Sequence, residues 1–267
     1  MIRQPAVAGS FYSRDAVQLR SDVKHFLVTV YKKQTVLGIV APHAGYLYSG
    51  RVAGNLYSRI TIPDTVVILS PNHTGCGAPY SIWPNGSWRT PLGETEVNEE
   101  LVNELVSLCD LLEKDQEAHV SEHAAEVQLP FIQQLNPQAK IVVIVLSSGN
   151  ISDLKQIGIC LSQAIKKICP KALVVASSDM SHHESQASAN KKDKIAIHEI
   201  LSLNENNLYE KVHEMHITMC GIYPAVTMLT CSKERGAKNA ELVRYETSGD
   251  ITGDYNHVVG YAGIMIS

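Results

Sequence analysis

The sequence contains no hydrophobic run long enough to cross a membrane. Its longest strongly apolar runs are residues 141–146 and 258–266, whereas a spanning helix needs about 20 apolar residues. Residues 1–18 also lack the apolar stretch of about 7–15 residues that marks a secretory signal peptide. We therefore expect a cytoplasmic protein that has no membrane partner.

The sequence also lacks an excess of positive charge. It has 23 Lys and Arg against 27 Asp and Glu, a formal net charge of −4 over 267 residues. A general nucleic-acid binder needs a basic patch to neutralise phosphates, so we expect no nucleic-acid partner. The 45% hydrophobic and 19% charged residues are ordinary for a globular protein and exclude a disordered, collagen-like or coiled-coil chain.

No C-x-x-C pair is present, which removes the usual signature of a zinc ribbon or a thioredoxin-type redox site. In the cytoplasm we expect reduced thiols, and free cysteines are most often small buried residues. The six cysteines are Cys76, Cys109, Cys160, Cys169, Cys220 and Cys231.

Three common catalytic signatures are missing as well. There is no G-x-S-x-G nucleophile elbow and no phosphate-binding G-x-x-x-x-G-K. Gly75-Cys76-Gly77 begins like G-x-G-x-x-G but continues Ala78-Pro79-Tyr80. The serine hydrolase, P-loop ATPase and dinucleotide-dependent dehydrogenase classes are therefore disfavoured.

The sequence does contain four short runs rich in Val and Ile that predict buried strands. They lack period-2 alternation, as expected when both faces of a strand are covered. Helical patterns lie between them, so we predict an α/β fold, a three-layer α/β/α sandwich around a mostly parallel or mixed sheet, in one domain spanning residues 1–267. The predicted strands are 35–41, 64–70, 140–147 and 171–178, with a further strand pair at 241–247 and 257–266.

Three helices are predicted from the spacing of apolar residues. Residues 96–108 have acidic residues in the first turns, and residues 151–168 have apolar residues every three or four positions. Residues 122–135 follow Ser121, which we predict to be the N-cap of that helix.

Polar clusters follow the predicted buried strands, and they carry the main functional signal. In open α/β sheets, ligands bind in the crevice beyond the carboxyl ends of the strands. Parallel neighbouring strands would therefore bring His43, His73, Asp179 and His182 to one edge. Imidazoles together with a carboxylate or thiolate suit Zn, Fe or Cu. For the adjacent His183 we expect a place outside the site, because neighbouring side chains point apart.

Cys220 lies in a loop just before a helix-like segment, AVTMLT. A helix N-terminus stabilises a thiolate and can lower the pKa of a thiol, which suits a metal ligand and a nucleophile equally well. From the sequence pattern alone, a buried inert thiol is favoured over both.

One further pattern, His119-Val120-Ser121-Glu122-His123, matches the H-x-x-E-H of a class of zinc peptidases. That mechanism needs both histidines on one helical face. With Ser121 as N-cap, His119 would lie outside the helix, so we disfavour a peptidase. The pattern leaves the roles of Glu122 and His123 open.

Eight blocks of the sequence resemble the Memo family, whose microbial members are also called protein B of the AmmeMemoRadiSam system. The blocks run in order along nearly the whole chain, and several are six or more residues long. They are 3–12, 41–50, 69–75, 88–94, 121–133, 177–183, 219–225 and 248–263.

The resemblance implies a fold similar to the catalytic subunit of class III extradiol dioxygenases, which are non-haem Fe(II) enzymes. It implies that His43, His73 and Cys220 are metal ligands, and that Asp179 and His182 line the same pocket. In the ring-cleaving relatives the residue matching His182 is an acid/base group and the third ligand is a carboxylate. A thiolate there is softer, suits Cu(I) or Zn(II) as well as iron, and is oxidisable, so ring cleavage does not follow from the fold.

The leading hypothesis is therefore a mononuclear site of His43, His73 and Cys220 that holds Fe(II) or Cu(I), with Zn as a further option. It would support redox or oxygenase-like chemistry on an unidentified small molecule, with Asp179 tuning the site and His182 moving protons.

Two alternatives remain open from the sequence. In the first, the catalytic cleft of the ancestral fold binds a protein or an anionic peptide through the histidines and nearby residues. In the second, Cys220 acts as a nucleophile without a metal. The sequence makes no prediction of oligomeric state. The cleft residues considered are Tyr46, Tyr48, Trp83, Trp88 and Arg89.

Overall fold

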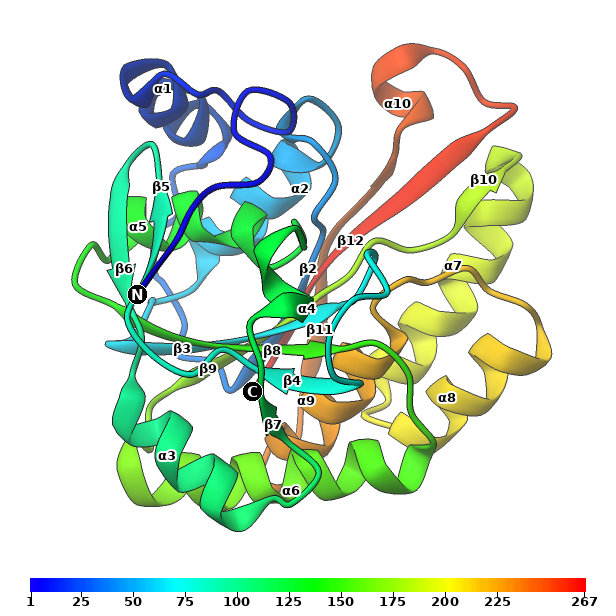
Figure 1. Ribbon diagram of the computed structural model, residues 1–267. Helices are drawn as coiled ribbons and strands as arrows, with labels where there is room; N and C mark the ends of the chain where they lie inside the picture. The colour runs from blue at the N-terminus through cyan, green and yellow to red at the C-terminus, as the bar shows by residue number, and fades with distance from the viewer.

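A mixed β-sheet of nine strands forms the centre of the computed structural model, which describes residues 1–267 (Figure 1). Its path is β10-β12-β2-β9-β3-β8-β4-β7, and β11 pairs with β12. The sheet strands are β2 (Gly38–Ala41), β3 (Thr65–Pro71), β4 (Tyr80–Ile82), β7 (Glu113–Lys114), β8 (Lys140–Leu146), β9 (Leu173–Ser177), β10 (His182–Glu184), β11 (Ala240–Thr247) and β12 (Val258–Ile266).

The four predicted buried strands are the parallel centre of this sheet, in the order β2-β9-β3-β8. All residues of β2, β3 and β9 are buried, as is β8 after its first residue. The predicted C-terminal pair is also present, because β11 and β12 are antiparallel neighbours. The predicted α/β sandwich is thus confirmed, with antiparallel strands β12 and β4 flanking the parallel centre.

Helices cover both faces of the sheet (Figure 1). One layer contains α3, α6 and α9, where α6 packs on α9 and α9 on β9, β3 and β2; the other contains α1, α2 and α5. The helices are α1 (Ala16–Phe26), α2 (Tyr46–Arg59), α3 (Glu99–Leu108), α4 (Glu117–Val120), the 3-10 helix η1 (Glu126–Gln128), α5 (Leu129–Leu135), α6 (Ile151–Ile168), α7 (Gln186–Leu201), α8 (Glu205–Glu214), α9 (Ile222–Glu234) and α10 (Gly249–Thr252).

Helix α6 shows why the sequence folds in this way locally. Its bounds match the predicted 151–168, and the Asn150 side chain caps it by accepting a hydrogen bond from the Asp153 amide. Asp153 in the first turn and Lys166 and Lys167 in the last turn complement the helix dipole. None of the helices combines the length and the apolar character that crossing a bilayer requires.

The N-terminal segment packs against the loop between β7 and α5. A small sheet of β1 (Ile2–Arg3), β5 (Ser87–Thr90) and β6 (Gly93–Glu96) forms beside it, in the order β1-β5-β6. The Arg3 guanidinium is buried in an ion pair with Glu126 and stacks over the Trp88 ring at 4.4 Å. Residues more than 120 positions apart in sequence are thereby joined.

Candidate metal centre

Three neighbouring strands deliver polar residues to one pocket. His43 follows β2, His73 follows β3, and Asp179 and His182 follow β9, which lies between the other two. The cavity there has a volume of about 420 Å³. Its lining is Ser10, Phe11, His43, Ala44, Gly45, Tyr48, His73, His123, Asp179, His182, Val259 and Tyr261.

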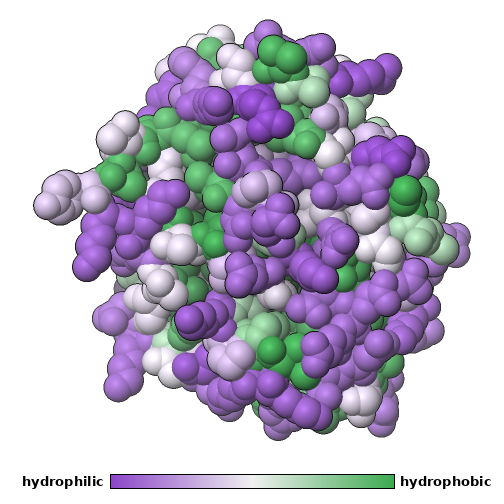
Figure 2. Space-filling view, turned by 90° about the vertical axis from the view of Figure 1, so that its left-hand side faces the viewer, coloured by the Kyte–Doolittle hydropathy of each residue, from purple (hydrophilic) through white to green (hydrophobic).

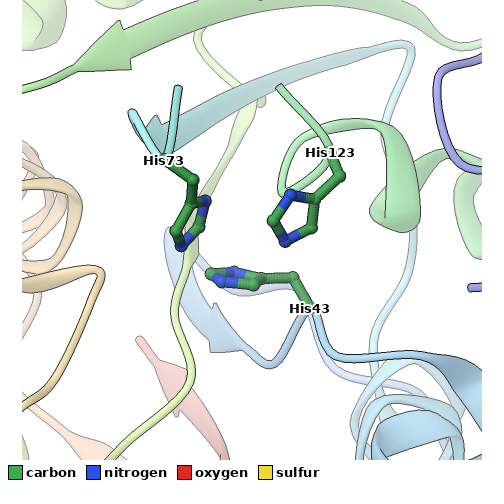
Figure 3. Close-up of side chains that lie close together, drawn as sticks. All are labelled: His43, His73 and His123. Carbon is green, nitrogen blue, oxygen red and sulfur yellow. The ribbon is translucent and has the colours of Figure 1, made fainter. Parts of the chain in front are cut away.

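His43, His73 and His123 point toward one another in this pocket (Figure 3). One ring nitrogen of each lies within 4.8 Å of those of the other two. The ring centroids of His73 and His123 are 4.5 Å apart, and that of His43 is 5.2 and 5.5 Å from them. Three converging imidazoles are a sufficient protein ligand set for a transition metal.

The sequence placed His123 on a helix capped by Ser121, and the structure corrects this. Ser121 is the C-terminal cap of the short helix α4, and η1 does not begin until Glu126. The Glu122 carboxylate accepts a hydrogen bond from the Ala124 amide, 2.9 Å away, and so stabilises a turn instead of a helix. His123 therefore projects into the pocket from an irregular segment.

The peptidase-like pair His119 and His123 does not assemble. His119 lies in the separate short helix α4, outside the helices that follow Ser121, as predicted, and its ring is fully buried beside Trp83 and Trp88. Its Nε2 is 2.7 Å from the Ser81 hydroxyl. The two histidines therefore face different surroundings, and H-x-x-E-H does not form the peptidase arrangement in this chain.

The buried His119 ring predicts acid sensitivity. The pKa of His119 is lowered from 6.5 to about 3, mainly by burial and also by Arg3, while Asp115 and Glu122 partly oppose the shift. Between these values the unfolded chain binds a proton that the folded chain excludes, so stability falls as the pH falls. Through this group, the unfolding free energy of the wild type should fall by about 2 kcal/mol between pH 7 and pH 5. We expect His119→Gln not to show this part of the decrease.

Urea denaturation at the two pH values measures this effect. The slope against pH is the readout, because the substitution can also change stability at pH 7. His25→Gln, at an exposed site on α1, is the matched control for the chemical change. Equal pH dependence in wild type and His119→Gln would contradict the prediction.

His43 is buried and neutral. Burial, followed by the neighbouring His73, His123 and His182, lowers its pKa well below the usual value. Its backbone amide donates to Asp179 Oδ1 at 2.8 Å, which fixes the start of the loop after β2. A neutral imidazole is the form that binds a metal.

His73 is oriented by a buried carboxylate. Its Nδ1 is 2.9 Å from Glu122 Oε1, and Glu122 is fully buried. Burial alone would lower the pKa of His73, but the Glu122 carboxylate outweighs it and the pKa is raised. Because Nδ1 donates to Glu122, Nε2 is left for the pocket, as in carboxylate–histidine–metal arrangements.

Cys220 lies beside His43, with its Sγ 3.2 Å from Nε2 of that ring. The amide of Asp179 donates to the sulfur at 3.3 Å. Gly221 permits this close approach, because a Cβ there would lie 2.5 Å from the Ser177 carbonyl oxygen. Burial and then the Asp179 charge raise the pKa of the thiol, so the depressed pKa considered from the helix N-terminus is not found.

Asp179 and His182 complete the inner wall. Burial raises the pKa of Asp179 to about 6, although hydrogen bonds from the amides of His43 and Ala44 oppose the shift. His182 donates from Nδ1 to the Thr218 carbonyl at 2.8 Å, which leaves the Nε2 lone pair free. His183 is exposed and does not line the pocket, as expected.

Most residues considered for an anionic-peptide cleft lie elsewhere. Tyr48 lines the pocket, but Trp83 and Trp88 are buried in the core under the N-terminal segment. Arg89 pairs with Glu94 on β6. On the face shown in Figure 2, the hydrophobic residues form scattered groups among hydrophilic ones. Of the five residues considered, only Tyr48 therefore lines the histidine pocket.

Sequence reasoning also missed the outer wall. Ser10 and Phe11 come from the N-terminal segment, and Val259 and Tyr261 from β12. The Phe11 ring lies 4.7 Å from that of His123. Both segments fall inside blocks of the sequence that resemble the Memo family. That resemblance was the signal by which these pocket residues could have been found.

Comparison with known proteins agrees with that resemblance. A family model described as Memo-like protein matches residues 3–265. MEMO1 family proteins of Methanococcoides burtonii, Sulfolobus acidocaldarius and Methanocaldococcus jannaschii are 41%, 40% and 39% identical to the chain. Each match covers 99% of this chain and 99 to 100% of the relative.

Among solved structures, the chain is similar in fold to an uncharacterized protein from Escherichia coli K12. The TM-score is 0.53 and the sequence identity 13%, over 86% of this chain and 99% of the other. At that identity the likeness concerns the fold alone.

Proposed function

This chain belongs to the Memo family, and on that premise we propose that it is a metal-binding protein with one mononuclear site built on His43 and His73. The observation that carries the proposal is the convergence of three imidazoles at the carboxyl ends of the parallel central strands of the sheet. His123 completes the nitrogen donors, and the Cys220 sulfur lies next to His43, where it would bind the ion as a thiolate.

The donor set fits a borderline-soft transition metal. Imidazoles suit Zn, Cu and Fe, whereas a thiolate favours Cu(I), Zn and iron. We propose Fe(II) or Cu(I) as the resident ion, with Zn(II) as an alternative occupant. Fe(II) or Cu(I) would supply one-electron chemistry, whereas Zn(II) would not.

The surrounding residues suit redox or oxygenase-like chemistry on a small molecule. His182 presents a free Nε2 for proton transfer, since its Nδ1 is engaged by Thr218. Phe11, Tyr48 and Tyr261 are the aromatic residues of the pocket wall. No Lys or Arg lines the cavity, so the pocket offers an anionic substrate no cationic side chain.

Anaerobic titration of the apo-protein with Fe(II), Cu(I) and Zn(II) tests the proposal. We expect one equivalent to bind, and X-ray absorption to report imidazole nitrogen ligands, with a sulfur ligand in the Cu(I) form. Binding of none of the three ions, or a ligand shell made only of oxygen, would contradict it.

A further inference from the structure

Ser177, the last residue of β9, lies behind the histidine cluster. It contacts both His43 and the segment that carries His123. Its Oγ is 3.0 Å from His43 Nδ1 and 2.8 Å from the carbonyl oxygen of Ala124, the residue after His123. Gln128 Nε2 is the third neighbour, at 2.9 Å. Ser177 is fully buried and Gln128 is 1% exposed, so solvent does not compete for these contacts.

The orientation of the Gln128 amide follows from its other partners. The carbonyl oxygen of Pro42, which can only accept, is 3.0 Å from one amide atom, so that atom must be the nitrogen. The Tyr57 hydroxyl donates to the other atom, Oε1, at 2.9 Å. Gln128 therefore donates to Ser177, and the reverse orientation would place two oxygens against each other.

Counting hydrogens then fixes the state of His43. The Ser177 hydroxyl has one proton and two lone pairs. The Ala124 carbonyl can only accept, so it takes the proton, and the Gln128 amide occupies one lone pair. The remaining lone pair faces His43 Nδ1, which must carry a hydrogen to complete the bond.

We propose that Ser177, held by Gln128, is a positioning residue that locks His43 in the Nδ1–H tautomer and ties its ring to the segment carrying His123. His43 then presents the Nε2 lone pair toward Cys220 and the pocket. The part of the inference that concerns the metal rests on the proposed function, whereas the tautomer does not.

Removing the hydroxyl leaves three buried groups without their partner: His43 Nδ1, the Ala124 carbonyl and one Gln128 N–H. An isolated imidazole favours neither tautomer strongly, so His43 in Ser177→Ala should populate both. Loss of a hydrogen-bond partner behind a metal-binding histidine typically weakens metal affinity by about 10–100-fold, and we expect that range here.

The test is ¹⁵N NMR of histidine-labelled apo-protein, followed by metal titration of the same samples. Wild type should show His43 protonated at Nδ1, and Ser177→Ala a mixture. The matched control is Ser162→Ala, which removes a hydroxyl that is 1% exposed and makes no hydrogen bond. It should keep both the tautomer and the affinity.

An unchanged His43 tautomer in Ser177→Ala would overturn the proposal. A changed tautomer in a protein that binds no metal would support the positioning role and refute the proposed function instead. If Ser177→Ala fails to fold, Ser177→Cys replaces it. A thiol is a weaker hydrogen-bond partner than a hydroxyl, so the Nδ1–H population should fall, and an unchanged population would likewise overturn the proposal.

Discussion

His43→Ala should lose metal binding at every concentration that saturates wild type, a reduction in affinity of more than about 100-fold. Its Nε2 lies next to the Cys220 sulfur and belongs to the cluster of three imidazoles, so its removal takes away the donor that joins the sulfur to the other two rings. Losing a hydrogen-bond partner of a metal ligand weakens metal affinity by about 10–100-fold. Losing the ligand itself should weaken the affinity more. Anaerobic titration followed by metal analysis measures the effect.

Two further variants separate loss of a ligand from loss of the fold. His43 is buried, and its removal leaves a cavity, whereas the His73 side chain is 33% exposed. His73→Ala leaves a smaller buried gap, and the amides of His73 and Ala124 still donate to Glu122, so this variant should fold and still lose the metal. His183→Ala, at an exposed neighbouring histidine, should bind like wild type. Wild-type metal content in both His43→Ala and His73→Ala would remove the site assignment.

Cys220→Ser gives a different signature. The three imidazoles remain, so Zn(II) should still bind, but Cu(I) affinity should fall because the soft donor is gone. An unchanged preference among the metals would show that the sulfur, although 3.2 Å from His43, is not a ligand.

The sequence predicted the centre of the sheet because buried parallel strands are local, nearly uniform apolar runs. Residues 64–70, for instance, became β3, which is buried along its whole length. The edge on which His43, His73 and Asp179 gather then follows from parallel pairing alone. These features depend on periodicity and strand direction, which a single sequence carries.

The third imidazole could not be found in this way. The segment 122–135 has helical spacing, and Ser121 is a good N-cap by residue type, yet the chain turns at Glu122. The cause is tertiary: the Glu122 side chain binds His73, nearly fifty residues away, and does not stabilise a helix start. Local propensity was overridden by a contact that no local pattern encodes.

The N-terminal segment was missed for the same reason. Its role depends on Glu126, which accepts hydrogen bonds from Arg3, Tyr12 and two backbone amides of residues 6 and 7. None of these contacts has a periodic signal in the sequence. A buried Arg–Glu pair is recognisable only when the fold is known.

Arg3→Met should lower the free energy of unfolding by about 3–5 kcal/mol, the usual cost of leaving one partner of a buried ion pair uncompensated. The Arg3 side chain is 1% exposed and that of Glu126 is fully buried, so water cannot replace the lost charge. Arg3 also donates to the backbone carbonyls of His119 and Glu122, and both would lose a partner. Urea denaturation at pH 7 is the measurement.

The double variant Arg3→Met with Glu126→Gln shows whether the penalty comes from the stranded charge. If it does, the double variant should be more stable than Arg3→Met alone, because the buried carboxylate is gone. Arg89→Met, which breaks the exposed pair with Glu94, should have a far smaller effect. Equal losses in Arg3→Met and Arg89→Met would contradict the prediction.

Because the anchored segment carries Phe11 to the His123 ring, Arg3→Met should also loosen the outer wall of the metal centre, which hydrogen exchange at residues 6–12 would report.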